Sequence, residues 1–236
     1  MNTSLDMLQK IMTAQIHKND IVANNLANVS TNGFKREVAF FDILSQNSEG
    51  PGVNVRTNFE QGPLKQTSNP LDLAIRGRGF FVVETDKGDA LTRDGHFTVS
   101  NDGYLVTSSN HPLAGLGGRI DVPLDEFSEG DISINESGEI FVGERFIDQI
   151  KIAQIEDSSI LSKIGENLFK APRSYALSEA PESTVLQGQL EGSNVNPVVE
   201  MVHLIELQRQ FESSQRAMSA IDNVLGKAAS DISRYR

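Results

Sequence analysis

The sequence has no cysteine and no tryptophan, and aromatic residues make up only 6% of its 236 positions. Without cysteine, the chain cannot form disulfide bonds, thiolate zinc sites or a cysteine nucleophile. Hydrophobic residues account for 38% of the chain. This share is low for a protein with one large core, and it favours an elongated molecule.

Long apolar runs and basic blocks are also missing. No uninterrupted apolar run is long enough to span a membrane, and the first residues lack the basic start and apolar block of a cleavable signal peptide. If the protein leaves the cytoplasm, we expect its export to depend on another signal. The formal net charge is -11, which argues against binding nucleic acid through its phosphates and predicts no nucleic-acid partner.

The sequence patterns of catalytic and metal sites are absent as well. Gly77 and Gly79 precede an expected strand, whereas a phosphate-binding glycine loop precedes a helix, so a tight turn or a close backbone approach is the better interpretation. No GxSxG element occurs. The histidines show no HxxxH or HExxH spacing: His17, His96, His111 and His203. We expect no enzymatic activity, no cofactor and no metal.

The C-terminal stretch carries the clearest periodic pattern in the chain. Its seam positions alternate in spacings of three and four, and only a serine interrupts their apolar character: Leu204, Leu207, Phe211, Ser214, Met218, Ile221, Leu225, Ala228 and Ile232. Such spacing places all of them on one stripe of an α-helix and suits a coiled-coil partner. Pro197 fits the first helical turn after a capping region formed by residues 194–196.

The N-terminal stretch follows the same rule. Its seam positions are Leu5, Leu8, Met12, Gln15, Asn19, Val22, Leu26 and Val29. Gly33 is the expected stop for this helix or for the turn that follows it. We expect the two terminal helices to pair with each other and with copies of themselves. Two alternatives stay open: a stable helical hairpin docked on the rest of the chain, or ends that become ordered during assembly.

Asparagines are concentrated in residues 23–29. Three asparagines, Asn24, Asn25 and Asn28, lie within five positions, and asparagine is a mediocre helix former. They mark either a fraying helix end or amides that bond to neighbouring chains and fix the helix register.

The middle of the chain predicts antiparallel β structure. Residues 45–69 are rich in Gly, Pro, Asn, Gln and Ser, which is typical of an irregular or β-hairpin connector. From Leu71 to about Arg173, short alternating runs separated by Asx-Gly turns predict an antiparallel sheet, as a small barrel or a sandwich. We expect the last strand at residues 149–155, a short helical turn at 158–164 and a loop at 173–182.

The expected fold class is therefore α+β, with the terminal helices pairing as a coiled coil and with an antiparallel β domain in the central part of the chain. The expected segments are an N-terminal helix (1–33), a connector (34–69), the β domain (70–182), a return connector (183–196) and a C-terminal helix (197–236).

Three blocks together resemble the bacterial flagellar rod and hook family of axial proteins. They are ANNLANVSTNGFKR at 23–36, PLDLAIRGRGFF at 70–81 followed by TRDG at 92–95, and LEGSNVNPV at 190–198, which continues into the C-terminal helix. The resemblance implies an inner coiled-coil domain with the β domain outside it, in subunits that stack into a hollow tube within the cell envelope. It also implies export in an unfolded state through the flagellar type III apparatus.

Within the family, the short connector and residues 117–123 and 186–195 resemble the proximal rod protein. Residues 28–36 suit the distal rod protein equally, and residues 77–81 resemble it more. The expected partners are copies of the chain, other rod subunits and the export apparatus. A non-polymerising helical module that binds one partner is the alternative from another class. The residues that we expect to make assembly contacts are Asn24, Asn25, Leu26, Asn28, Gly33, Phe34, Asn194, Val195, Asn196, Leu204, Phe211, Met218, Ile221 and Leu225.

Overall fold

The computed structural model describes residues 2–42, 52–123, 132–172, 178–179 and 183–234. The chain divides into two compact units. We call the first the helical unit, drawn from residues 1–27, 37–58 and 196–236, and the second the β unit, drawn from residues 28–36 and 59–195. The α+β class expected from the sequence is confirmed, because two long helices and a set of antiparallel strands make up the chain.

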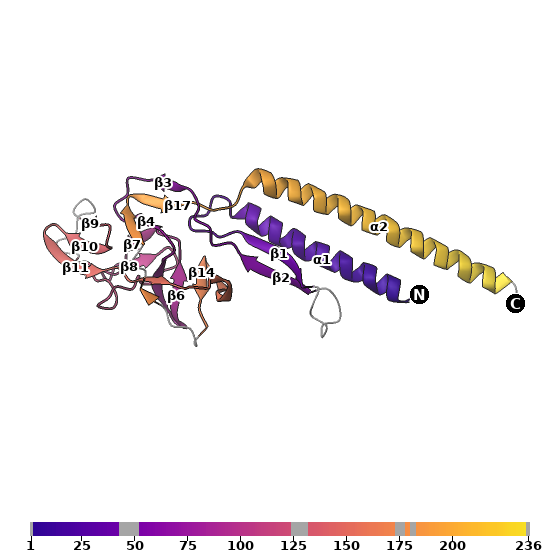
Figure 1. Ribbon diagram of the computed structural model, residues 1–236, viewed down its shortest axis with the longest axis horizontal. Coiled ribbons are helices and arrows are strands. Elements are labelled where there is room, and N and C mark those ends of the chain that lie inside the picture. Colours follow the sequence, from indigo (N-terminus) through magenta and orange to yellow (C-terminus); the bar gives the residue numbers. More distant parts are fainter. Residues whose placement is uncertain (1, 43–51, 124–131, 173–177, 180–182, 235–236) are drawn as a thin grey trace. The chain divides into compact units, whose positions relative to one another are not determined.

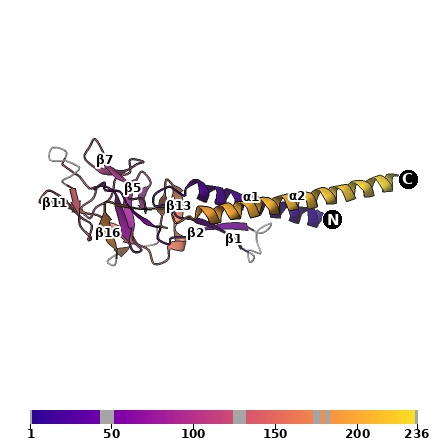
Figure 2. The ribbon, with the colours of Figure 1, turned by 90° about the horizontal axis from the view of Figure 1, so that it is seen from above.

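The helical unit consists of two helices and one hairpin. Helix α1 (Asn2–Ala27) and helix α2 (Pro197–Arg234) lie side by side, and they run in opposite directions (Figures 1 and 2). Strands β1 (Glu37–Asp42) and β2 (Gly52–Thr57) form an antiparallel hairpin that packs against α1. The connector therefore contributes a hairpin, one of the two forms that its composition predicted.

The ends of the helices follow local rules. The side chain of Asn196 accepts hydrogen bonds from the backbone amides of Val198 (3.0 Å) and Val199 (3.3 Å), and Pro197 occupies the first helical position. Helix α2 therefore begins at Pro197. Helix α1 ends at Ala27, and Gly33 belongs to the turn that follows it, with a φ of 67°.

The β unit contains fifteen described strands, which form several small antiparallel sheets. The strands are β3 (Leu64–Gln66), β4 (Leu73–Arg76), β5 (Phe80–Thr85), β6 (Gly88–Thr92), β7 (Phe97–Val99), β8 (Leu105–Thr107), β9 (Ile132–Ile134), β10 (Glu139–Val142), β11 (Arg145–Gln149), β12 (Ile152–Gln154), β13 (Ser162–Gly165), β14 (Leu168–Lys170), β15 (Ser178–Glu179), β16 (Thr184–Gln187) and β17 (Gln189–Glu191).

The largest sheet has six strands in the order β13-β14-β6-β5-β12-β15, and a second has the order β11-β10-β9. The pairs β16-β4, β17-β3 and β7-β8 complete the unit. The expected antiparallel pairing is confirmed. The small barrel is not found, because none of these sheets closes on itself within the described strands.

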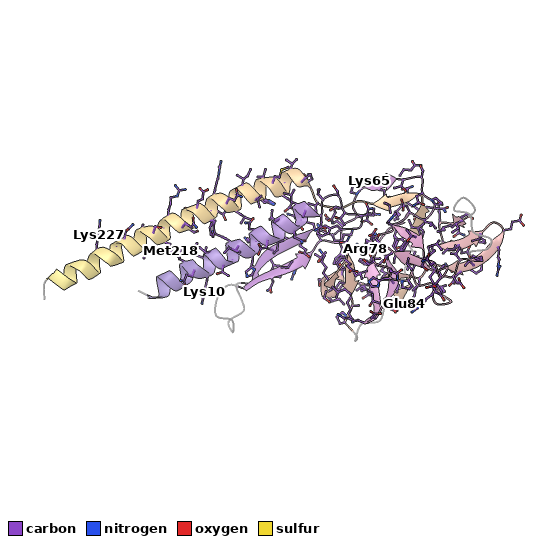
Figure 3. All side chains as sticks on the ribbon, turned by 180° about the vertical axis from the view of Figure 1, so that it is seen from behind. Lys10, Lys65, Arg78, Glu84, Met218 and Lys227 are labelled. Carbon is purple, nitrogen blue, oxygen red and sulfur yellow. The ribbon has the colours of Figure 1, made fainter. Side chains whose placement is uncertain are left out.

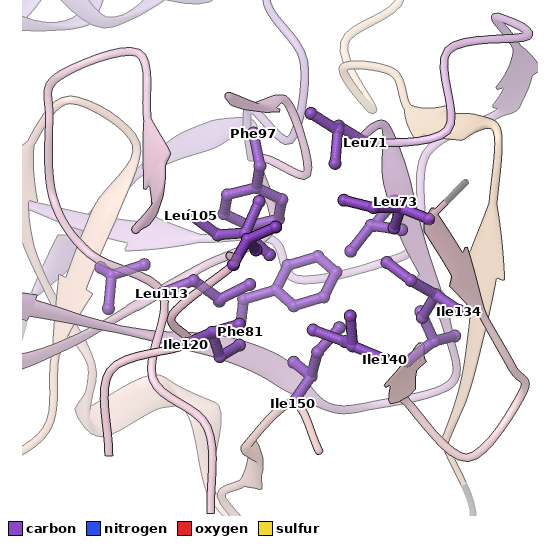
Figure 4. Close-up of a cluster of buried hydrophobic side chains, with 14 of the residues drawn as sticks. Leu71, Leu73, Phe81, Phe97, Leu105, Leu113, Ile120, Ile134, Ile140 and Ile150 are labelled. Carbon is purple, nitrogen blue, oxygen red and sulfur yellow. The ribbon is translucent and has the colours of Figure 1, made fainter. Parts of the chain in front are cut away.

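Strand β5 lies at the centre of the core and is buried on both faces. Phe81 and Val83 point into one apolar cluster, whereas Phe80 and Val82 point into another, because successive side chains of a strand face opposite sides. Figure 4 shows Phe81 among the side chains of the first cluster, which other strands and loops supply. A strand buried on both faces cannot show an apolar–polar alternation, and residues 80–83 show none.

The second half of the β unit departs from its sequence pattern. The stretch predicted as the last strand, 149–155, contains the end of β11 and the short β12, and further strands follow. The predicted helical turn is confined to a 3₁₀ turn, Ser158–Ile160, because residues 162–165 pair with β14 instead. The predicted loop at 173–182 lies outside the described residues except for 178–179, which form β15. Gly77, with a φ of 119°, lies in a bend between β4 and β5, and Gly79 follows it directly before β5.

Candidate assembly interface

The seam predicted on α2 is the partly covered face of that helix. Most positions between the seam residues are exposed. The seam residues whose side chains are described are all partly buried: Leu204, Leu207, Phe211, Ser214, Met218 and Ile221. The side chain of Leu225 lies outside the described part of the structure. Among the described side chains of the two helices, Ala14 is the single apolar residue that is buried. The helix pair therefore has almost no closed apolar core.

The outer face of α2 is apolar near its start. Five large aliphatic side chains there are between 42% and 63% exposed: Val198, Val199, Met201, Val202 and Ile205. We call this set the outer strip. Figure 3 shows side chains standing clear along the face of α2 that is turned away from α1. Contiguous exposed apolar residues of this kind mark contact surfaces for other proteins.

Asn25 connects α1 to the hairpin and to α2. Its side chain is 1% exposed; its Nδ2 donates to the carbonyl of Glu37 (2.8 Å), and its Oδ1 accepts from the amide of Glu37 (2.9 Å). A longer contact of 3.5 Å joins Nδ2 to Oε2 of Glu200, which is fully buried. Asn25 thus uses its hydrogen-bonding capacity within its own chain, where it fixes the start of β1.

The other asparagines named from the sequence have different surroundings. Asn24 is exposed, and Asn28 accepts a hydrogen bond from Thr31 Oγ1 (3.1 Å) in the turn after α1. Asn194 accepts from the amide of Arg36 (2.7 Å) and donates to the carbonyl of Glu60 (3.0 Å). Together with Asn196 at the start of α2, most of these residues shape turns and ends of elements.

The apolar and glycine residues of the first and third blocks are mostly buried. Gly33 donates its amide to the carbonyl of Glu191 (2.7 Å), and a Cβ added to it would meet the backbone of Arg93 and Asp94 at 2.3–2.4 Å. Phe34 is 2% exposed, with the ammonium of Lys163 4.1 Å from its ring centre. Val195 is also buried, whereas Leu26 is partly buried.

A buried charged cluster joins the three sequence blocks inside the β unit. The carboxylate of Glu191 accepts hydrogen bonds from Lys35 Nζ, from Arg93 Nη1 (3.0 Å) and from the amide of Gly62 (2.9 Å). All three charged side chains are at most 3% exposed. Burial lowers the pKa of Lys35 and that of Arg93, and the neighbouring Glu191 opposes the shift in both.

Sequence reasoning missed this cluster. Lys35 belongs to the first block, Arg93 to the second and Glu191 to the third. Charged residues occur in all three blocks, but the first two blocks contain several, and nothing in the sequence shows which of them pair. No spacing rule could show this pairing, because a one-dimensional pattern does not encode contacts 98 or 156 positions apart.

Comparison with protein families gives three matches along the chain. The model described as "Flagella basal body rod protein" matches residues 11–35, "Flagellar hook protein FlgE/F/G D1 domain" matches 74–142, and "Flagellar basal body rod FlgEFG protein C-terminal" matches 186–231. These regions overlap the three blocks on which the sequence resemblance depends. Among the described residues, neither helix is long and apolar enough to cross a membrane.

Several characterised proteins are similar over most of their length. The flagellar basal-body rod protein FlgF of Caulobacter vibrioides is 36% identical over 233 residues, which covers 91% of this chain and 90% of the relative. The flagellar basal-body rod protein FlgG of Borreliella burgdorferi is 34% identical over 252 residues, covering 92% and 94%. FlgG of Bacillus subtilis is 32% identical over 243 residues, covering 88% and 90%.

Proposed function

The chain belongs to the family of flagellar basal-body rod proteins, and we propose that it polymerises through α1 and α2 into the hollow driveshaft that transmits torque from motor to hook. It is a structural subunit of the basal-body rod, located in the flagellar basal body within the cell envelope, and it assembles with other rod subunits. Its role is structural rather than enzymatic. The pairing of α1 and α2 as a coiled coil belongs to this proposal.

The observation that carries the proposal is the missing core of the helix pair. Helices α1 and α2 are 26 and 38 residues long, yet Ala14 is the single buried apolar residue among their described side chains. Long helices are stabilised mainly by packing an apolar face against a partner. We therefore expect helices of neighbouring subunits to cover the partly buried seam and the outer strip.

The strength of a single contact explains why assembly needs a growing end. Covering the half-exposed side chains of the outer strip contributes about 1 kcal/mol each, or about 5 kcal/mol in total. Bringing two proteins together costs about 4–15 kcal/mol in translational and rotational freedom. One such contact does not hold two copies together, whereas several neighbours at the end of a rod do.

We place the chain in the proximal rod, because its short connector and residues 117–123 resemble the proximal rod protein. We further propose that it is exported unfolded through the flagellar type III apparatus. Electron microscopy of basal bodies purified from a strain with a tagged chain tests the position in the rod. Label near the hook instead of near the motor would contradict the proximal assignment.

The assembly contacts that we propose are those named from the sequence, and the seam provides the sharpest test. Leu26→Asp and Ile221→Asp place a charge on partly buried seam positions, so we expect both to abolish motility and rod assembly. Ser213→Asp, on an exposed position of α2, is the matched control. Hydrogen exchange should show that the β unit of each variant remains folded. Normal rods in both seam variants would overturn the proposal.

A further inference from the structure

The groove between α1 and α2 contains two buried acceptors without donors. Among the side-chain atoms that the structure describes, three are buried without a hydrogen-bond partner, and two of them are Gln15 Oε1 and Asn19 Oδ1. Both residues occupy seam positions of α1. An unpaired buried acceptor is costly, and native proteins seldom leave one without a partner.

The groove has room for an incoming side chain and walls that suit a cation. Its volume is about 420 Å³, and it is lined by Gln15, Ile16, Asn19, Leu207, Gln208, Phe211 and Glu212. The carboxylate of Glu212, whose Oε2 also lies 3.9 Å from Nη2 of Arg216 in the same chain, adds a negative charge to the two amide oxygens. The ring of Phe211 offers an aromatic face, which attracts a guanidinium. Three acceptor groups, two amides and one carboxylate, beside an aromatic ring match the five donors and the flat shape of an arginine side chain.

Such an arginine is present on the opposite face of the same helix. Arg209 is exposed and has no hydrogen bond or ion pair within the described residues. It lies two positions from both Leu207 and Phe211, about 200° around the helix from each. It also continues the outer strip, because Val198, Val202, Ile205 and Arg209 are spaced by four, three and four residues. Arg209 therefore faces away from the groove of its own chain.

We infer that Arg209 of one copy enters the α1–α2 groove of a second copy, donates to Gln15, Asn19 and Glu212, and brings the outer strip against the groove walls. The inference rests on the proposed function and adds the identity of the contact. Donor and acceptor lie on different faces of one chain, so the contact is heterologous. Repeated heterologous contacts produce rings or open helical assemblies, and an open assembly is the form that a rod requires.

Cross-linking tests the contact directly, because the natural chain contains no cysteine. Two differently tagged copies are expressed together, one with Ile16→Cys and the other with Ile205→Cys in the outer strip, so that Arg209 stays in place. Basal bodies are then purified and mildly oxidised. We expect a disulfide-linked dimer that carries both tags. The control pair, Ile16→Cys with Lys10→Cys, replaces an exposed basic residue of α1 (Figure 3) and should give no such dimer.

The outcomes separate this inference from the proposed function. Chains that are present in basal bodies but give no mixed dimer would overturn the inference and leave the rod role intact. Chains that are absent from basal bodies, with or without the cysteines, would overturn both. A disulfide-linked dimer in both the test pair and the control pair would also overturn the inference, because the contact would then be non-specific.

A charge exchange provides a second, independent readout. Arg209→Glu should lower incorporation into rods roughly tenfold, because charge-assisted hydrogen bonds are replaced by repulsion from Glu212. Combining it with Glu212→Arg should restore incorporation. Lys10→Glu makes the same change of charge elsewhere and should have little effect. Normal incorporation of the Arg209→Glu chain, or failure of the exchange to restore it, would contradict the contact.

Discussion

Glu191 accepts a hydrogen bond from the ammonium of Lys35 across 156 positions of sequence, and neither side chain reaches solvent. Arg93 donates to the second oxygen of the same carboxylate. One anion thus compensates two buried cations, and it ties the segment after α1 to the segment before α2. This clasp lies in the β unit and closes the ends of that unit on each other.

Removing the charge of Glu191 should destabilise the β unit strongly. Glu191→Gln keeps the size of the side chain but leaves Lys35 and Arg93 buried without their counter-ion, and breaking a buried pair costs about 3–5 kcal/mol. We expect a loss of that order in the free energy of unfolding, measured by urea denaturation of the purified chain. Glu136→Gln, at an exposed position, should change it by less than about 0.5 kcal/mol. Equal stability of the two variants would show that the clasp contributes little.

Gly33 should tolerate no side chain, for two separable reasons. Its φ of 67° disfavours any residue with a Cβ, and the added atom would meet the backbone of Arg93 and Asp94. Gly188 has a similar φ of 71°, but a Cβ there has no neighbour within 4 Å. Gly188→Ala should therefore cost about 1 kcal/mol, and Gly33→Ala about 2 kcal/mol or more, measured by thermal unfolding. If both variants lose the same free energy of unfolding, the backbone of Arg93 and Asp94 does not restrict a side chain at Gly33.

Asn25→Ala should loosen the start of the hairpin. The change leaves the amide and the carbonyl of Glu37 without their partner, at a cost of about 1–3 kcal/mol. Hydrogen exchange at the Glu37 amide, at the start of β1, should become faster, with strand β5 of the β unit unaffected. Gln9→Ala, at an exposed position of α1, is the control and should leave the exchange unchanged. Unaltered protection at Glu37 in the Asn25 variant would contradict the assigned role.

Asp94 should make the stability of the β unit depend on pH in the acid range. Burial raises the pKa of its carboxyl above the ordinary 3.8, and the nearby Asp72 acts in the same direction, against the opposing effects of His96. Because this pKa is raised in the folded state, the folded chain binds the Asp94 proton more tightly than the unfolded chain does. The resulting contribution to stability is complete below pH 3.8 and is lost as the pH rises through the folded pKa.

The Asp94→Asn variant removes this dependence. As the pH rises from 3 to 6, the stability of the natural chain should therefore fall relative to that of Asp94→Asn, as followed by urea unfolding at a series of pH values. A relative rise over the same range would show that the folded pKa is lowered instead.

The sequence alone determined the features that depend on neighbours along the chain. The seam spacing predicted which face of α2 is partly covered, and Pro197 with the capping region before it indicated where that helix begins. Both follow from the sequence because helix periodicity and capping act over a few residues. The sequence also placed Gln15 and Asn19 on the seam of α1, without indicating that their oxygens would lack donors.

The tertiary structure decided what depends on residues far apart. It brought Lys35, Arg93 and Glu191 into one buried cluster, and it directed Asn25 to its own chain's hairpin. It paired residues 162–165 with β14, where the sequence predicted a helical turn. The physical reason is that a buried charge or amide is stable only beside a partner. Which partner it meets is set by the packing of whole segments and not by local spacing.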